Sequence, residues 1–272
     1  WGLASTPQGT FPEATLRDSL EYGYNRAKIA WYNIEPVLQD KRNLNNPVRS
    51  FENFNDPRIR SVNVTQLYPN RTPDFGQAQL VTFDLAFYPS DKGPYNFDAR
   101  PNSVTPEGKL LNPERRWGGI MRGLDQVDFE TGNVEFIEMW VQDPFLLNPA
   151  SSGGEMYFDL GNISEDVLRD GRKSFENGLP TSSQISDVDS TNLARVPTKI
   201  QLTNSFSNDA AARKYQDVGL DGLNDQDENL FFDSIVKRSK TLGVDISEDP
   251  SADDFEFFRG DKLDAKKACI RE

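Results

Sequence analysis

The chain has 272 residues, of which 43 are acidic, 30 are basic and none is histidine, so its formal net charge is −13. This acidic balance argues against a nucleic-acid binder, because such proteins need a basic surface to displace counterions. The lack of histidine excludes a Ser-His-Asp triad, a Cys-His dyad and a His-bound zinc site within the chain. The single cysteine, Cys269, excludes an internal disulfide.

Hydrophobic residues make up 36% of the chain and include 18 phenylalanines, so a sizeable core is expected. No run approaches the roughly 20 apolar residues of a transmembrane helix, so we expect a chain that does not itself span a membrane. The sequence opens on Trp1 with no basic and then apolar leader. We therefore expect a fragment of a longer protein.

Residues 1–45 form the opening segment. Apolar residues recur there at close to helical spacing, which predicts a helix over 16–34 that Pro36 terminates. Its aromatic residues suit either docking onto a neighbouring domain or stacking against a sugar. The residues of the apolar series are Leu16, Leu20, Tyr24, Ala27 and Trp31.

Residues 46–180 have the patterns of a β-rich domain. Alternation of apolar and polar residues predicts half-buried strands, and Val134–Gln142 is apolar on both faces, as in a central strand. Short strands separated by turns favour two packed antiparallel sheets. We therefore expect a mainly β fold, a jelly-roll sandwich of the galactose-binding-like kind with additional α-helical segments. The predicted strands are Ile59–Leu67, Gln79–Tyr88, Val134–Gln142 and Glu155–Leu160.

Two further features of this domain have local explanations. Ser164 is expected to cap a short helix, although a recognition loop remains an alternative. Arg115, Arg116 and Arg122 surround Trp117, an arrangement that suits either an internal cation–π bracket or a patch that binds an acidic peptide.

The C-terminal third changes character. Residues 181–198 are expected to form a linker loop, because they are polar and lack apolar periodicity. Residues 199–272 are expected to form a helical tail with an acidic loop. Helices are predicted around the alanine run 210–212 and over Asp227–Leu242.

The acidic loop supplies the strongest candidate metal site. Asp217, Asp221, Asp225 and Glu228 match positions 1, 5, 9 and 12 of a calcium-binding EF-hand loop, and Gly222 falls at its turn position. Two residues spoil the match, since Gly219 replaces a usual ligand and Asn224 stands where an apolar residue is usual. The alternative is an acidic turn between helices, with Asp225 as the cap of the second one. No catalytic constellation emerges, and we expect a protein that is not an enzyme.

Several phrases along the chain resemble the Sov/SprA family, the outer-membrane translocon of the type IX secretion system. They are LASTPQG (3–9), YGYNRAKIAWYNIEP (22–36), NPERRWGGIMRGL (112–124), LGNISEDVLRDGRKSFENGLP (160–180), RKYQDVGLDGLNDQDE (213–228) and DPSADDFEFFRG (249–260). Together they are spread over nearly the whole chain.

The resemblance implies a giant β-barrel in the outer membrane of Bacteroidetes, which exports folded cargo and, in gliding species, surface adhesins. This chain would be a soluble insertion that acts as a cap, plug or interaction module, more often extracellular than periplasmic. The implied partners are the rest of the barrel, secreted cargo and other subunits of the secretion system. The alternative from the residues alone is a carbohydrate-binding or calcium-binding surface module.

Overall fold

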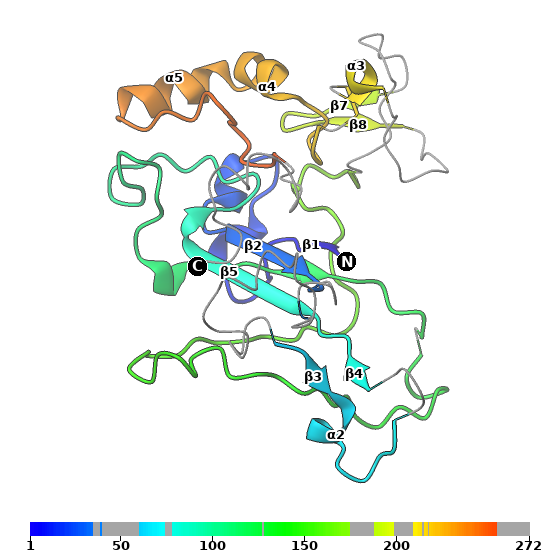
Figure 1. Cartoon of the computed structure of the whole chain (residues 1–272). Coiled ribbons are helices and arrows are strands. Elements are labelled where there is room, and N and C mark those ends of the chain that lie inside the picture. The colour runs from blue at the N-terminus through cyan, green and yellow to red at the C-terminus, as the bar shows by residue number, and fades with distance from the viewer. Residues whose placement is uncertain are drawn as a thin grey trace. The chain divides into compact units, whose positions relative to one another are not determined.

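The computed structural model describes residues 1–34, 39, 60–73, 78–126, 128–174, 188–198, 209–213, 215–216 and 218–254 (Figure 1). The chain divides into two compact units. The first combines Trp1–Lys28 with Pro89–Glu272, and the second is Ile29–Tyr88.

The described strands form four two-stranded sheets. The pairs β1–β6, β3–β4 and β7–β8 are antiparallel, with Gly2 opposite Met121 in the first of them. A jelly roll needs two larger sheets packed face to face. The described residues show small sheets and few helices, hence a mostly β or mixed fold, and they do not show a jelly-roll sandwich. The pairs are β1 (Gly2–Leu3) with β6 (Ile120–Met121), β2 (Ala27–Tyr32) with β5 (Asp84–Lys92), β3 (Val62–Asn63) with β4 (Gln79–Leu80), and β7 (Val188–Ser190) with β8 (Arg195–Pro197).

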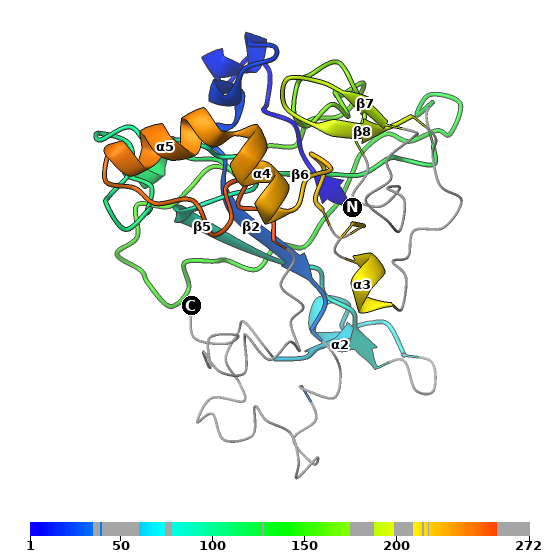
Figure 2. The same ribbon diagram turned by 90° about the horizontal axis from the view of Figure 1, so that it is seen from above.

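The helices are short. Two of them, α4 and α5, follow one another and change direction at Phe232 (Figure 2). The single helix predicted over Asp227–Leu242 is therefore interrupted, and the ring of Phe232 packs at 4.6 Å from that of Phe97. The predicted alanine-rich helix is confirmed as α3. The helices are η1 (Pro12–Thr15), η2 (Leu20–Gly23), α2 (Val64–Leu67), η4 (Pro113–Arg115), α3 (Ala210–Arg213), α4 (Asp225–Phe231) and α5 (Asp233–Thr241).

The helix predicted over 16–34 is wrong. One 3₁₀ turn, η2, begins after Ser19, whose side chain accepts a hydrogen bond from the Glu21 N–H, and the chain then enters strand β2. The backbone N–H of Ala27 donates to the carbonyl of Trp117 at 2.8 Å. Ala27 and Trp31 are four residues apart, but with Ile29 they also fit the two-residue period of a strand. Pairing with distant parts of the chain therefore selected the strand over the helix.

The strands predicted at Val134–Gln142 and Glu155–Leu160 are also wrong as paired strands. Neither segment pairs as a strand with the described part of the chain, and the green ribbon of Figure 1 carries no arrows there. Residues 135–139 form no backbone hydrogen bond with any described residue, and a strand exists only where a neighbour completes its ladder. The large apolar side chains of these segments therefore lie in solvent. Phe136 is 72% exposed and Phe158 60%.

Smaller corrections have local causes. Within the predicted strand Ile59–Leu67, β3 ends after two residues, because the side chain of Gln66 accepts the Asn63 N–H and begins helix α2. The predicted strand Gln79–Tyr88 is confirmed as β4 and β5, with a break between them.

Two loops also differ from expectation. Ser164 accepts the Asp166 N–H in a turn at 3.3 Å, and the described residues 165–174 that follow it form no helix. In the predicted linker, residues 188–190 form strand β7, whereas 181–187 lie outside the described residues.

The core lies in the first unit, and among the described residues of the second unit only Val64 is buried. One cluster of the core combines Ala27, Ala99, Val104, Leu110 and Val244, which come from distant parts of the chain. Among the residues that the structure describes, no helix has the length and apolarity needed to cross a membrane.

Candidate metal centre

The turn that precedes α4 places the first acidic residue. Gly222 has φ +72° there, and its N–H donates to the Val218 carbonyl at 3.1 Å. The next residue, Leu223, donates its N–H to the Asp221 side chain at 3.0 Å. The left-handed turn thus points the Asp221 carboxylate inward, where it is 1% exposed. Glycine suits this position because it adopts positive φ without strain.

Helix α4 places the second acidic residue. The side chain of Asn224 accepts the Asp227 N–H at 3.0 Å, so Asn224 is the N-cap, and the alternative in which Asp225 caps this helix is wrong. Glu228 follows one turn later and is completely buried. A short polar N-cap satisfies one of the orphan N–H groups of the first turn, which fixes where the helix begins.

Ser251 holds the C-terminal turn against this pair. Its hydroxyl donates to Asp221 at 2.8 Å, and its backbone N–H donates to Glu228 at 3.0 Å. Two residues later, the N–H of Asp253 donates to the Asp249 carboxylate at 3.2 Å. The turn therefore brings a third carboxylate, that of Asp253, toward Asp221 and Glu228.

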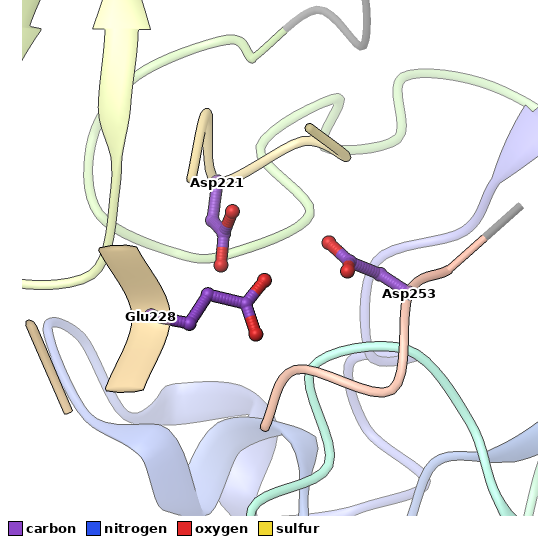
Figure 3. A group of neighbouring side chains, drawn as sticks. All are labelled: Asp221, Glu228 and Asp253. Carbon is purple, nitrogen blue, oxygen red and sulfur yellow. The ribbon is translucent and has the colours of Figure 1, made fainter. Parts of the chain in front are cut away.

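The three carboxylates converge on one small volume (Figure 3). One oxygen each of Asp221, Glu228 and Asp253 lies within 4.8 Å of the other two. A second set, Asp225, Glu228 and Asp249, meets the same criterion and shares Glu228. Ligand oxygens around one cation lie at such separations, since Ca²⁺–O distances are about 2.3–2.6 Å.

The electrostatics of the group are unfavourable when all three members are ionised. Burial is the main cause that raises the pKa values of Asp221, Glu228 and Asp253, and the negative charge of Asp221 raises those of the other two further. Within the described part of the chain, none of the three forms an ion pair with a lysine or arginine. Neutralisation must come from protons or from a cation.

The sequence identified part of this centre. Of the four predicted ligands, the structure brings Asp221 and Glu228 together, places Asp225 in the second set, and leaves Asp217 outside the described residues. The sequence missed Asp253, along with Asp249 and Ser251. The only signal for them was the acidic turn DPSADD at 249–254, which carries no ligand spacing of its own.

The basic cluster around Trp117 is structural in part. The Arg116 guanidinium donates to the carbonyl of Tyr24 at 2.9 Å and to that of Ser103 at 3.1 Å, and the side chain is buried. The cation over Trp117 is Arg26, at 5.3 Å from the ring centroid, and not a member of the predicted cluster. An internal bracket therefore exists, but with a different arginine.

A small-molecule site has less support. The cavity lined by Arg26, Tyr95 and Val167 holds about 20 Å³, enough for about one water molecule. Ligand pockets measure about 300–1,000 Å³, so this cavity is too small. A second, more open hollow lined by Gln8, Arg17 and Arg169 holds about 360 Å³, which lies within that range, but it contains no group of converging buried polar side chains. The carboxylate centre is thus the best-organised polar site among the described residues.

Comparison of the sequence with models of known protein families and with curated proteins finds no match.

Proposed function

We propose that this chain is a non-catalytic domain of a type IX secretion outer-membrane translocon, where it contributes to protein export as a cap, plug or interaction module. The resemblance of the phrases between residues 3 and 260 supplies the family. The observation that carries the role is the exposed apolar segment 134–160 of the first unit.

The residue composition of this segment predicts paired strands, but its large apolar side chains are exposed to solvent. Val141 and Leu147 join Phe136 and Phe158 among side chains that are more than half exposed. Monomeric proteins rarely leave such a stretch in water, and large exposed apolar patches mark interaction sites. The backbone of residues 135–139, which forms no backbone hydrogen bond with a described residue, also offers hydrogen-bonding groups to a new strand. Both properties support a role in binding protein rather than in catalysis.

In the parent translocon the partners would be the rest of the barrel, other subunits of the secretion system or secreted cargo. Pairing with such a partner would turn Val134–Gln142 and Glu155–Leu160 into the strands that their alternation predicts, and would complete a jelly-roll-like sandwich in the assembly. We place the domain on the extracellular side of the outer membrane, since long insertions in outer-membrane barrels are usually extracellular.

Replacement of the apolar side chains in the parent protein tests this role. The variant Phe136→Ser/Val141→Ser/Phe158→Ser should cut secretion of a cargo with a C-terminal secretion signal to less than half. The matched control is Glu135→Ser/Glu138→Ser/Asp159→Ser, which alters exposed polar residues of the same segments.

Both variants must reach the outer membrane in equal amounts, as judged by immunoblots of membrane fractions. Equal secretion by the apolar variant and the control would overturn the proposed role of this segment.

A carbohydrate-binding module is the second candidate. The side chains of Trp140 and Tyr157 are 66% and 64% exposed, as a sugar-stacking platform requires, whereas Trp117 is buried and is removed from that role. Binding on a glycan array that is lost in Trp140→Ala would favour this candidate over the translocon role. An array without hits would eliminate it.

A further inference from the structure

The centre around Glu228 has an unmet requirement for positive charge. Three carboxylates from the turn before α4, from α4 itself and from the turn at 249–254 meet in the interior of the first unit (Figure 3). Burial of an ionised carboxylate is costly unless a partner compensates it. The described residues supply hydrogen bonds from Ser251 and Leu223 and the nearby hydroxyl of Tyr95, but no basic side chain.

A second observation is independent of the acidic composition. The Oε1 atom of Glu228 is buried, and no described residue hydrogen-bonds to it, although Oε2 accepts the Ser251 N–H. The Oδ2 atom of Asp253 is also buried and has no hydrogen bond of good geometry, but the hydroxyl of Tyr95 lies beside the Asp253 carboxylate, so Glu228 is the clearer exception. Buried polar atoms nearly always have a partner, so each exception requires an explanation. In Figure 3 the Glu228 carboxylate points toward the other two.

We infer that Asp221, Glu228 and Asp253 bind one hard divalent cation, and that the site selects Ca²⁺. The cation completes the coordination of the two unsatisfied oxygens and neutralises the group. This inference goes beyond the proposed translocon role, because it concerns the internal stability of the domain and does not depend on any partner.

The donor set decides the class of metal. All the ligating atoms are carboxylate oxygens, which suit Ca²⁺, Mg²⁺ or Mn²⁺ rather than the softer ions that favour nitrogen and sulfur. The chain contains no histidine at all. Mg²⁺ usually keeps several of its waters, whereas Ca²⁺ accepts a shell built from protein oxygens. Since Asp221 and Glu228 are almost completely buried, the site favours the ion that gives up its water.

The site would act as a clasp between parts of the chain. Asp253 lies 25 residues beyond Glu228 in the sequence, and hydrogen bonds from Ser251 already hold this turn against α4. A cation between the two would fix the turn 249–254 far more strongly than these two hydrogen bonds. A ligand that binds only the native state raises its stability by mass action.

The test uses the 272-residue chain, freed of metal with a chelator and then titrated with CaCl₂ by isothermal calorimetry. We expect one saturable site, and a melting temperature that rises by about 5 °C at a hundredfold excess of Ca²⁺ over the dissociation constant. MgCl₂ at the same concentration should give a clearly smaller shift.

Two isosteric variants locate the site. Asp253→Asn and Glu228→Gln should each weaken Ca²⁺ binding at least about tenfold, since each removes one charged ligand. The control is Glu248→Gln, which removes an exposed carboxylate five residues before Asp253. If either variant fails to fold, the shift of the other against the control still decides the assignment.

Each result has a defined meaning. A calorimetric site that is unchanged in both variants would place the calcium elsewhere and overturn the inference. So would a melting temperature that does not respond to millimolar Ca²⁺, because the carboxylates would then be neutralised by protons alone. Equal responses to Ca²⁺ and Mg²⁺ would contradict the selection of calcium. None of these outcomes bears on the secretion experiment.

Discussion

The hydroxyl of Ser251 donates a buried hydrogen bond to the carboxylate of Asp221, 30 residues earlier in the chain, at 2.8 Å. Both residues are 1% exposed or less. The contact joins the C-terminal turn to the loop before α4, so its loss should be felt across the first unit.

Replacement of this serine is the first prediction. Ser251→Ala leaves a buried Asp221 oxygen without its donor, which should lower the free energy of unfolding by about 1–3 kcal/mol. Urea denaturation measures the change. Ser247→Ala removes a hydroxyl that donates to Asp245 at the surface and should cost less than about 0.5 kcal/mol. Equal losses in the two variants would contradict the structural role of Ser251.

Arg116 supplies the second prediction. Its guanidinium donates to carbonyls or side chains of four residues, namely Leu111, Tyr24, Asn25 and Ser103. Arg116→Ala leaves several of these acceptors without a hydrogen-bond donor and should destabilise the domain by about 3 kcal/mol. The neighbouring Arg115 is exposed, and Arg115→Ala should change the stability by less than about 0.5 kcal/mol. Thermal melts of the two variants make the comparison. Equal melting temperatures would show that the hydrogen bonds of Arg116 do not stabilise the domain.

Two glycines with similar backbone angles form a matched pair for the third prediction. Gly222 has φ +72° and Gly243 has φ +87°, so alanine is strained at both positions. A Cβ at Gly222 would lie 2.1 Å from the Arg195 carbonyl oxygen, whereas a Cβ at Gly243 meets no atom within 4 Å.

Gly243→Ala should therefore cost about 1–2 kcal/mol from the left-handed conformation alone. Gly222→Ala should cost at least about 2 kcal/mol more, because the turn must also move away from strand β8. The difference between the losses of unfolding free energy in the two variants measures the cost of the contact between the new Cβ and the Arg195 carbonyl. A difference near zero would show that the turn before α4 gives way without cost.

Lys92 supplies a prediction of pH dependence. Its Nζ is buried and makes no hydrogen bond with a described residue, and burial lowers its pKa to about 8 despite the opposing effect of Asp98. The folded state then binds fewer protons than the unfolded state between about pH 8 and 10.5, so the contribution of Lys92 to stability rises with pH in this window.

Lys92→Met should accordingly be more stable than the parent chain at pH 7, by roughly 1–3 kcal/mol, and the gap should close toward pH 10.5. Lys109→Met provides the control, since Lys109 is 58% exposed and pairs with Asp91 at the surface. Urea denaturation at pH 7 and at pH 10 measures both variants. A gap that stays constant with pH would mean that Lys92 is not the group that titrates.

The candidate site shows what local sequence determines and what it does not. Asp221 and Glu228 were predicted because a turn glycine and a helix start fix their separation within a few residues. Asp253 was not predicted, because it reaches Asp221 and Glu228 only through a turn that the hydrogen bonds of Ser251 hold in place. No spacing rule encodes such a contact. The same limit explains β2, which becomes a strand by pairing with β5, a segment more than 50 residues further along the chain.

The segment 134–160 shows a different limit. The alternation of apolar residues predicted strands, but pairing requires a neighbour, and the pattern does not say whether the chain contains one. Sheet formation is a property of two strands. Helix α3 needed no such partner, since its hydrogen bonds are internal, and it was confirmed.

The exposed segment 134–160 also bears on whether copies of the chain associate with one another. Extended apolar stretches of low net charge and without proline pair with copies of themselves into intermolecular sheets. This segment instead carries five acidic residues, no basic residue and the two prolines Pro144 and Pro149. The repulsion between these charges should keep copies of the chain apart while the apolar side chains are exposed. High salt, which screens that repulsion, is therefore expected to promote aggregation of the isolated chain.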